Sequence, residues 1–105
     1  MAKFLIKAAY TAEGTRGLMK EGGTARRAAI QKLVEAQGGK LEAFYYAYGA
    51  DDAIIIVDMD ANAGLALTLA VNASGAARLQ SAPLITPEDV DKATKASVAY
   101  TPPGR

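Results

Sequence analysis

The sequence of 105 residues contains no cysteine and no histidine, and these two absences exclude much of protein chemistry. Without cysteine there is no disulfide framework, no thiolate nucleophile and no cysteine-bound zinc or iron–sulfur centre. Without histidine there is no serine–histidine triad, no haem with a proximal histidine and no side chain whose unperturbed pKa lies near neutrality. The carboxylates fall at no recognised cage spacing, so we expect no metal, haem or other cofactor.

A strong charge of either sign and a long apolar run are also missing. Twelve basic residues nearly balance eleven acidic ones, which leaves a formal net charge of +1 and no basic surface for nucleic acid or anionic lipid. The longest uncharged stretch, residues 61–77, is interrupted by polar residues and is shorter than the roughly 20 apolar residues of a spanning helix. The first ten residues are too short and too interrupted by lysine for a signal peptide. We therefore expect a cytoplasmic protein that binds neither nucleic acid nor membrane.

Half of the residues are hydrophobic, which at this length predicts one globular domain over residues 1–105, with 98–105 as an extended tail. Apolar periodicity predicts its elements. They are a strand over 4–10, a helix over 25–37, strands over 41–48 and 53–59, a helix over 61–74, a strand over 77–85 and a helix over 87–97. The glycine-rich segment 11–23 is predicted to be a loop, with one helical turn over 16–20.

Small polar residues precede each predicted helix and indicate where it begins. The expected caps are Thr24 for the first helix, Asp60 or Asn62 for the second and Thr86 for the third. Pro83 cannot donate a ladder hydrogen bond, so the last strand is expected at a sheet edge. The order βαββαβ with an extra C-terminal helix predicts an α+β protein of ferredoxin-like fold, in which both main helices cover one face of an antiparallel sheet.

Both faces of the predicted hairpin are apolar. Strand alternation places Phe44, Tyr46 and Tyr48 on one face and Leu41, Ala43, Tyr45 and Ala47 on the other, and residues 54–57 are apolar throughout. Strands that are apolar on both faces are covered on both. Two helices cover only one face, so we predict a homodimer packed sheet to sheet, or a higher homo-oligomer.

Four segments are typical of one known family: residues 9–14 (Ala-Tyr-Thr-Ala-Glu-Gly), 20–29 (Lys-Glu-Gly-Gly-Thr-Ala-Arg-Arg-Ala-Ala), 38–45 (Gly-Gly-Lys-Leu-Glu-Ala-Phe-Tyr) and 100–104 (Tyr-Thr-Pro-Pro-Gly). Through them the sequence resembles the GYD-domain family over almost its whole length. The resemblance implies a dimeric α+β barrel but no particular activity. In the hairpin turn Gly49 and Asp52 match the family's Gly-Tyr-Asp element, and Asp51 stands where the tyrosine would be. Asp52 is thereby a candidate site residue, although adjacent aspartates in a turn are also commonly solvated.

The stretch over residues 20–27 is the strongest candidate ligand site. Two glycines lead into a helix capped by Thr24, and the free backbone N–H groups of such a terminus favour an anion. The basic residues beside it are Lys20, Arg26 and Arg27. The same residues also fit simple capping and a solvated surface.

Helical spacing places the two adjacent arginines on different sides of the predicted helix. Arg26 shares its side with Ile30 and Leu33, so its guanidinium is expected in a cavity, whereas Arg27 lies on the polar side. The phenol of Tyr10 is a further candidate donor to a ligand oxygen, with core or interface packing as the alternative.

Two classes of function remain open. The first is a binder or cofactor-independent enzyme that takes a small anionic or carbonyl-bearing organic molecule between sheet and helices. The second is a non-catalytic structural or accessory oligomer without a ligand. A polar-lined pocket containing Tyr10 or Arg27 favours the first, and a cavity filled by alanine, leucine and isoleucine favours the second.

Overall fold

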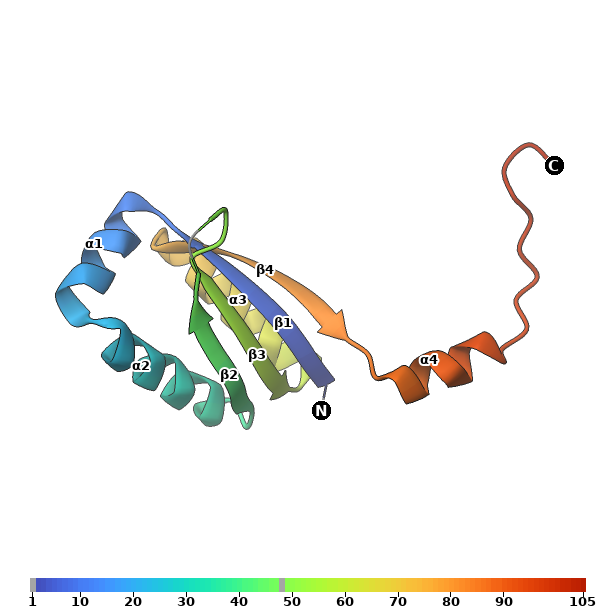
Figure 1. Ribbon diagram of the computed structural model, residues 1–105, viewed down its shortest axis with the longest axis horizontal. Coiled ribbons are helices and arrows are strands. Elements are labelled where there is room, and N and C mark those ends of the chain that lie inside the picture. Colours follow the sequence, from blue (N-terminus) through green and yellow to red (C-terminus); the bar gives the residue numbers. More distant parts are fainter. Residues whose placement is uncertain (1, 48) are drawn as a thin grey trace.

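The computed structural model describes residues 2–47 and 49–105 and contains one antiparallel sheet with helices packed on one of its faces (Figure 1). The strands are β1 (Ala2–Tyr10), β2 (Lys40–Tyr46), β3 (Ala53–Met59) and β4 (Ala77–Leu84). The helices are α1 (Ala12–Glu21), α2 (Gly23–Ala36), α3 (Ala61–Ser74) and α4 (Pro87–Thr94). Met1, and Tyr48 at the end of a predicted strand, lie outside the described residues.

The order of the strands across the sheet is β2-β3-β1-β4, with every neighbour antiparallel. The ferredoxin-like α+β fold is therefore confirmed, together with the predicted hairpin of β2 and β3. The strand that contains Pro83 is an edge strand, as predicted.

The core lies between the sheet and the helices. Ile6 of β1 stands opposite Ile55 of β3, and both are buried together with Val34 of α2 and Leu67 of α3. Because side chains alternate along a strand, the even residues of β1 and the odd residues of β3 face the helices. Both main helices thus cover the same face of the sheet.

The other face, which we call the open face, carries the remaining side chains of the strands. Leu5 pairs with Ile56 there, and Tyr45 pairs with Ile54. A β-bulge between Leu41 and Ala43 shifts the register of β2. The predicted grouping of Leu41 with Ala43 and Tyr45 is therefore wrong, because Leu41 pairs with the buried Val57 and shares the helix face.

Residues 12–21 form helix α1, so the predicted loop over 11–23 is wrong. The hydroxyl of Thr11 caps this helix by accepting from the Gly14 backbone N–H at 3.1 Å, and it donates to the Gly75 carbonyl at 2.8 Å. A Cβ built on Gly14 would lie 1.9 Å from the Ala76 carbonyl oxygen. Glycine is required there for close packing, which is why it did not indicate a loop.

The predicted cap Thr24 is also wrong, because Gly22 ends α1 and is the cap of α2. Its φ of +93° favours glycine, and none of the side chains that the structure describes caps α2. The caps Asp60 and Thr86 are confirmed: each side chain accepts a backbone N–H from the first turn of its helix. Helix α4 ends at Thr94, three residues before the predicted Ser97.

Residues 85–105, which we call the C-terminal arm, extend away from the sheet and its covering helices (Figure 1). The radius of gyration is 17.0 Å. A compact chain of this length has about 13 Å. In residues 2–47 and 49–105, no helix is long and apolar enough to cross a membrane.

Candidate functional site

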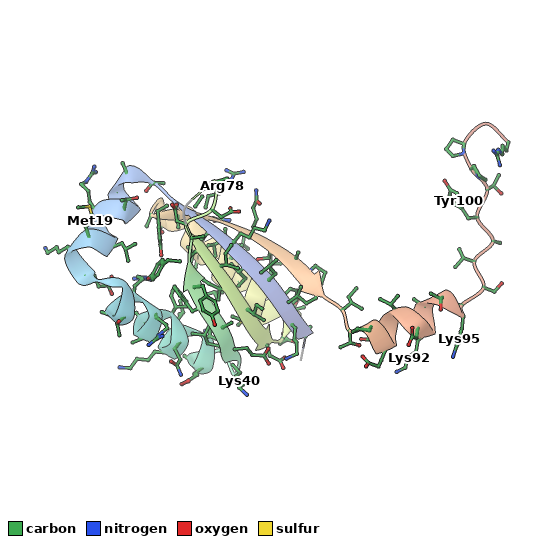
Figure 2. All side chains as sticks on the ribbon, viewed as in Figure 1. Met19, Lys40, Arg78, Lys92, Lys95 and Tyr100 are labelled. Carbon is green, nitrogen blue, oxygen red and sulfur yellow. The ribbon has the colours of Figure 1, made fainter. Side chains whose placement is uncertain are left out.

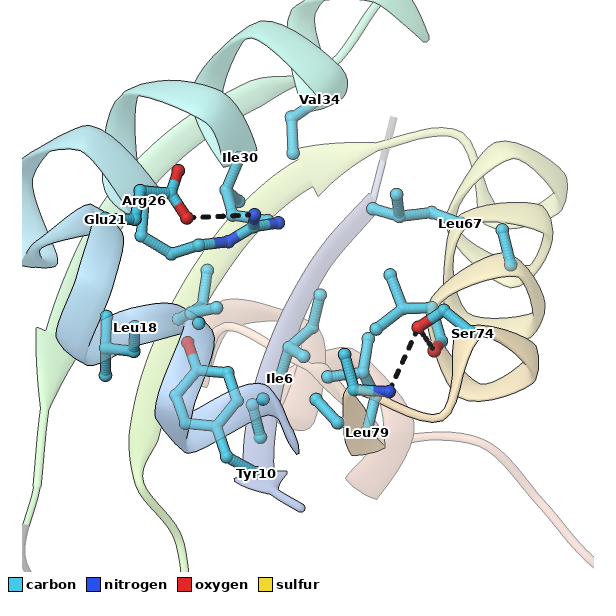
Figure 3. Close-up of a pocket in the computed structure, with 18 of the residues that line it drawn as sticks. Ile6, Tyr10, Leu18, Glu21, Arg26, Ile30, Val34, Leu67, Ser74 and Leu79 are labelled. Carbon is cyan, nitrogen blue, oxygen red and sulfur yellow. Dashed lines mark hydrogen bonds and ion pairs between the residues drawn. The ribbon is translucent and has the colours of Figure 1, made fainter. Parts of the chain in front are cut away.

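A cavity of about 500 Å³ lies between the helix face of the sheet and helices α1, α2 and α3 (Figure 3). Most of its wall is apolar. The sheet contributes Ile6, Ile55 and Val57, α2 contributes Ile30 and Val34, and α3 contributes Leu67 and Val71. Small-molecule sites typically enclose roughly 300–1,000 Å³ with mainly apolar walls, so this cavity has the size and lining of one.

The polar groups of the cavity come from different elements. Tyr10 stands at the end of β1, Glu13 and Glu21 belong to α1, Arg26 belongs to α2 and Ser74 ends α3. Figure 3 shows the phenol of Tyr10 and the guanidinium of Arg26 at the same end of the cavity, beside α1. Arg26 reaches the cavity because it stands one and two turns before Ile30 and Val34 on the same side of α2.

Arg26 and Glu21 form an ion pair across the junction of α1 and α2. The nearest Nη1 and Oε2 atoms are 3.6 Å apart, and each side chain is 37% exposed. An exposed pair at this distance contributes little, typically up to about 1 kcal/mol. The other N–H groups of the guanidinium remain able to bind a second acceptor.

Two phenols meet beside this ion pair. Burial raises the pKa of Tyr10 above its usual range, and the neighbouring Tyr46 raises it further while Arg26 lowers it. Burial also raises the pKa of Tyr46, whose hydroxyl donates to the Gly23 carbonyl at 3.1 Å. At neutral pH both phenols are therefore protonated, and Tyr10 presents an O–H donor to the cavity.

The raised pKa of Tyr10 predicts a loss of stability in alkali. Above about pH 10 the unfolded chain releases a phenol proton that the folded chain still holds, so the free energy of unfolding falls as pH rises. We expect Tyr10→Phe to make this decline shallower in urea denaturation between about pH 9 and pH 11. Part of the decline should remain in this variant, because the pKa values of Tyr46 and Lys3 are also raised. Tyr100→Phe is the control, since this side chain is 72% exposed; a decline equally steep in Tyr10→Phe and wild type would contradict the prediction.

The other predicted site residues lie outside the wall of the cavity. Lys20, Thr24 and Arg27 are exposed on α1 and α2. Asp52 holds the hairpin turn against β1: its Oδ2 accepts from the Tyr10 backbone N–H at 2.8 Å, and its own N–H donates to the Ala8 carbonyl at 2.8 Å. Asp52 therefore positions the strand that carries Tyr10.

Three residues that line the cavity were not predicted from the sequence as site residues: Glu13, Glu21 and Ser74. The two glutamates were missed because α1 was predicted to be a loop, so no wall was expected there. Ser74 donates to the Val71 carbonyl at 2.6 Å and accepts from the Ala76 N–H at 3.2 Å, as expected for the end of a helix. Across 2–47 and 49–105, no group of three Asp or Glu side chains is placed to hold a metal ion.

An antiparallel sheet with helices on one face, and a pocket between the two layers, defines a small α+β protein of ferredoxin-like fold. The family model of the GYD domain matches residues 4–94, so the chain belongs to the GYD-domain family. The resemblance noted in the sequence is thereby confirmed. No curated protein and no solved structure matches the chain.

Proposed function

We propose that the cavity binds or acts on one small organic molecule that carries a carboxylate or a carbonyl group. One observation supports this most directly: the Arg26 guanidinium and the Tyr10 phenol lie at the same end of an otherwise apolar cavity of about 500 Å³. A planar guanidinium fork suits a carboxylate, and a protonated phenol adds a second donor to the same oxygen atoms.

The charges on the cavity wall narrow the class of ligand. Among the described residues that line the cavity, Arg26 is the one cation, whereas Glu13 and Glu21 are both acidic. Because the carboxylates outnumber the guanidinium, negative charge on a ligand is disfavoured away from Arg26: a dianion fits worst, a monoanion fits only beside Arg26, and a neutral carbonyl compound meets no repulsion. Its apolar part would lie against Ile30 and Leu67, away from the polar end. Any reaction at this site would use hydrogen-bond donors that bind a carbonyl oxygen of the ligand and a carboxylate that accepts a proton from it.

Binding is testable with benzoate as the anionic probe and acetophenone as the neutral carbonyl probe. Removing a charged donor costs about 1.5–3 kcal/mol. Arg26→Ala should therefore weaken benzoate binding by about ten- to hundredfold in isothermal titration calorimetry. Arg27→Ala is the matched control, because it removes the same charge from the adjacent, exposed position of α2. Equal affinities in the two variants would contradict the proposal.

The alternative is an accessory oligomer that binds no small molecule. It is favoured by the apolar character of most of the wall and by the ion pair that Arg26 already makes with Glu21. Under this alternative neither probe binds wild-type protein, and Arg26→Ala affects only the stability of the α1–α2 junction.

We also propose that the chain forms a homodimer, or a higher homo-oligomer built from such dimers, through the open face. An apolar cluster on that face consists of Leu5, Ile54 and Ile56, and Lys7 stands opposite Ile54 beside it. Tyr45 on the neighbouring strand is 71% exposed. A second copy of the sheet would remove these side chains from water.

A further inference from the structure

A second cavity, of about 210 Å³, adjoins the first on the helix face of the sheet. Ile6 and Val57 line both cavities, and as buried strand residues that face the helices they form a common floor beneath them. From this floor the second cavity continues to Phe4, near the start of β1. Its α3 wall comes from residues 61–68, whereas residues 67–74 of the same helix line the first cavity. The two cavities therefore lie end to end along β1, beneath the length of α3.

The second cavity is apolar. Among the described residues that line it, none is charged, and its polar side chains are the hydroxyls of Thr68 and Ser81. The Thr68 hydroxyl already donates to the Gly64 carbonyl at 2.9 Å. A charged group would lose its hydration there without gaining a partner, so the cavity suits the uncharged end of a ligand.

Gly64 leaves part of this cavity open. It stands inside α3 without a positive φ, so its backbone does not require glycine. A Cβ built on it would make only ordinary contacts, 3.7 Å from Met59 Cγ and 4.0 Å from Phe4 Cε2. Alanine would therefore fit at this position and would stabilise the helix. Neither backbone nor packing explains the glycine, whereas space for a ligand does.

A negative group of the same ligand has one cation available along this path. Arg26 lines the first cavity, at the end away from Phe4. Figure 2 shows Lys40 and Arg78 projecting outward from the edge strands, and neither lines a cavity. The path thus offers one cationic end followed by a long apolar space.

We propose that the ligand is an unbranched long-chain monocarboxylate, with its head at Arg26 and Tyr10 and its alkyl chain running over Ile6 into the second cavity. This inference rests on the proposed function, because it adds a tail to the carboxylate bound there. The path from Tyr10 to Ile6 along β1 is about 13 Å long at about 3.3 Å per strand residue. An extended chain advances about 1.2 Å per single bond, so the tail enters the second cavity at about its eleventh carbon.

The wild-type protein tests this in isothermal titration calorimetry with octanoate, which fits the first cavity alone, and tetradecanoate, which reaches the second. Tetradecanoate should bind at least about a hundredfold more tightly, because each buried methylene contributes up to about fourfold. Tetradecanedioate should bind at least about tenfold more weakly than tetradecanoate, because its second carboxylate would lose its hydration. Equal affinities for octanoate and tetradecanoate, or for tetradecanoate and the diacid, would overturn the inference.

Thr68→Phe should fill the second cavity. We expect it to weaken tetradecanoate binding by at least about tenfold and to leave octanoate binding within about twofold, which also shows that the variant is folded. Leu69→Phe is the matched control, since this adjacent residue is 60% exposed and lines neither cavity. Equal losses for the two acids in Thr68→Phe, or equal losses of tetradecanoate in the two variants, would contradict the inference.

Gly64→Ala is a second variant that folding cannot confound. It should raise the urea midpoint and weaken tetradecanoate binding by about two- to fourfold, since one methyl group takes the place of part of the tail. An unchanged affinity for tetradecanoate would place the tail outside this cavity.

Failure of this inference is distinguishable from failure of the proposed function. If Arg26→Ala weakens benzoate and octanoate binding but wild type gains nothing from a longer chain, the tail site is overturned and the proposed function stands. If tetradecanoate binds wild type and Arg26→Ala equally well, the carboxylate has no anchor and both are overturned. Absence of binding by every acid likewise overturns both.

Discussion

Replacing Ile56 by Asp is expected to give a folded monomer, whereas replacing its neighbour Ile55 by Asp is expected to unfold the chain. Adjacent residues of β3 point to opposite faces of the sheet. Ile55 is 6% exposed and faces the helices opposite Ile6, so an unpaired charge there costs several kcal/mol. Total stabilities of small domains are only about 5–15 kcal/mol. Ile56 lies on the open face beside Leu5, where a charge becomes buried only when a partner docks.

Sedimentation velocity at micromolar concentration and far-ultraviolet circular dichroism separate these outcomes. The Ile56→Asp variant should keep its secondary structure and sediment as a monomer, whereas wild type should sediment as a dimer. The Ile55→Asp variant should lose the far-ultraviolet circular dichroism signal of its helices and strands. A wild-type chain that is already a stable monomer would overturn the proposed homodimer.

The second large effect is expected at Gly14. Gly14→Ala would place a Cβ 1.9 Å from the Ala76 carbonyl oxygen, a backbone atom that also accepts from the Thr11 N–H at 3.1 Å. Relief of this clash requires α1 to move from the segment before β4. We expect a loss of about 2–4 kcal/mol of unfolding free energy, in the range of other severe steric changes.

Gly17→Ala is the control within the same helix. Outside the backbone of its own helix, no atom of the described residues lies within 4 Å of a Cβ at Gly17, so alanine should stabilise α1 by up to about 1 kcal/mol through its higher helix propensity. Urea denaturation of both variants measures the difference. Equal effects at the two positions would show that α1 does not pack on Ala76. Because Gly14, Gly17 and Leu18 of α1 form part of the cavity wall, Gly14→Ala should also weaken benzoate binding by displacing that wall.

Local periodicity predicted most of the fold. The run of isoleucines in β3 and the apolar helix α3 were placed at their observed bounds, because each pattern needs no knowledge of the rest of the chain. Helix α1 was missed for the opposite reason. Its glycines lower helix propensity, and the contact that requires one of them is made with Ala76, far away in the sequence. The β-bulge at Leu41 likewise depends on pairing with β3.

The candidate site was predictable to a similar extent. The spacing of Arg26 and Ile30 along one helix placed the arginine correctly beside the cavity. The role of Asp52 in positioning β1 was not predictable, because its partner is a backbone N–H in another strand. The ion pair of Arg26 with Glu21 depends on the sharp junction at Gly22, whose φ of +93° no helical pattern indicates.

The bond from the Tyr10 N–H to Asp52 ties the hairpin turn to the end of the strand that supplies the cavity's phenol. Residues 49–52 of the turn are not among the residues that line that cavity. Substitutions beside Asp52, such as the aspartate at position 51 where the family resemblance places tyrosine, can therefore shift the phenol from outside the cavity. Under the proposed function, such a change in the turn would alter ligand preference without changing any lining residue.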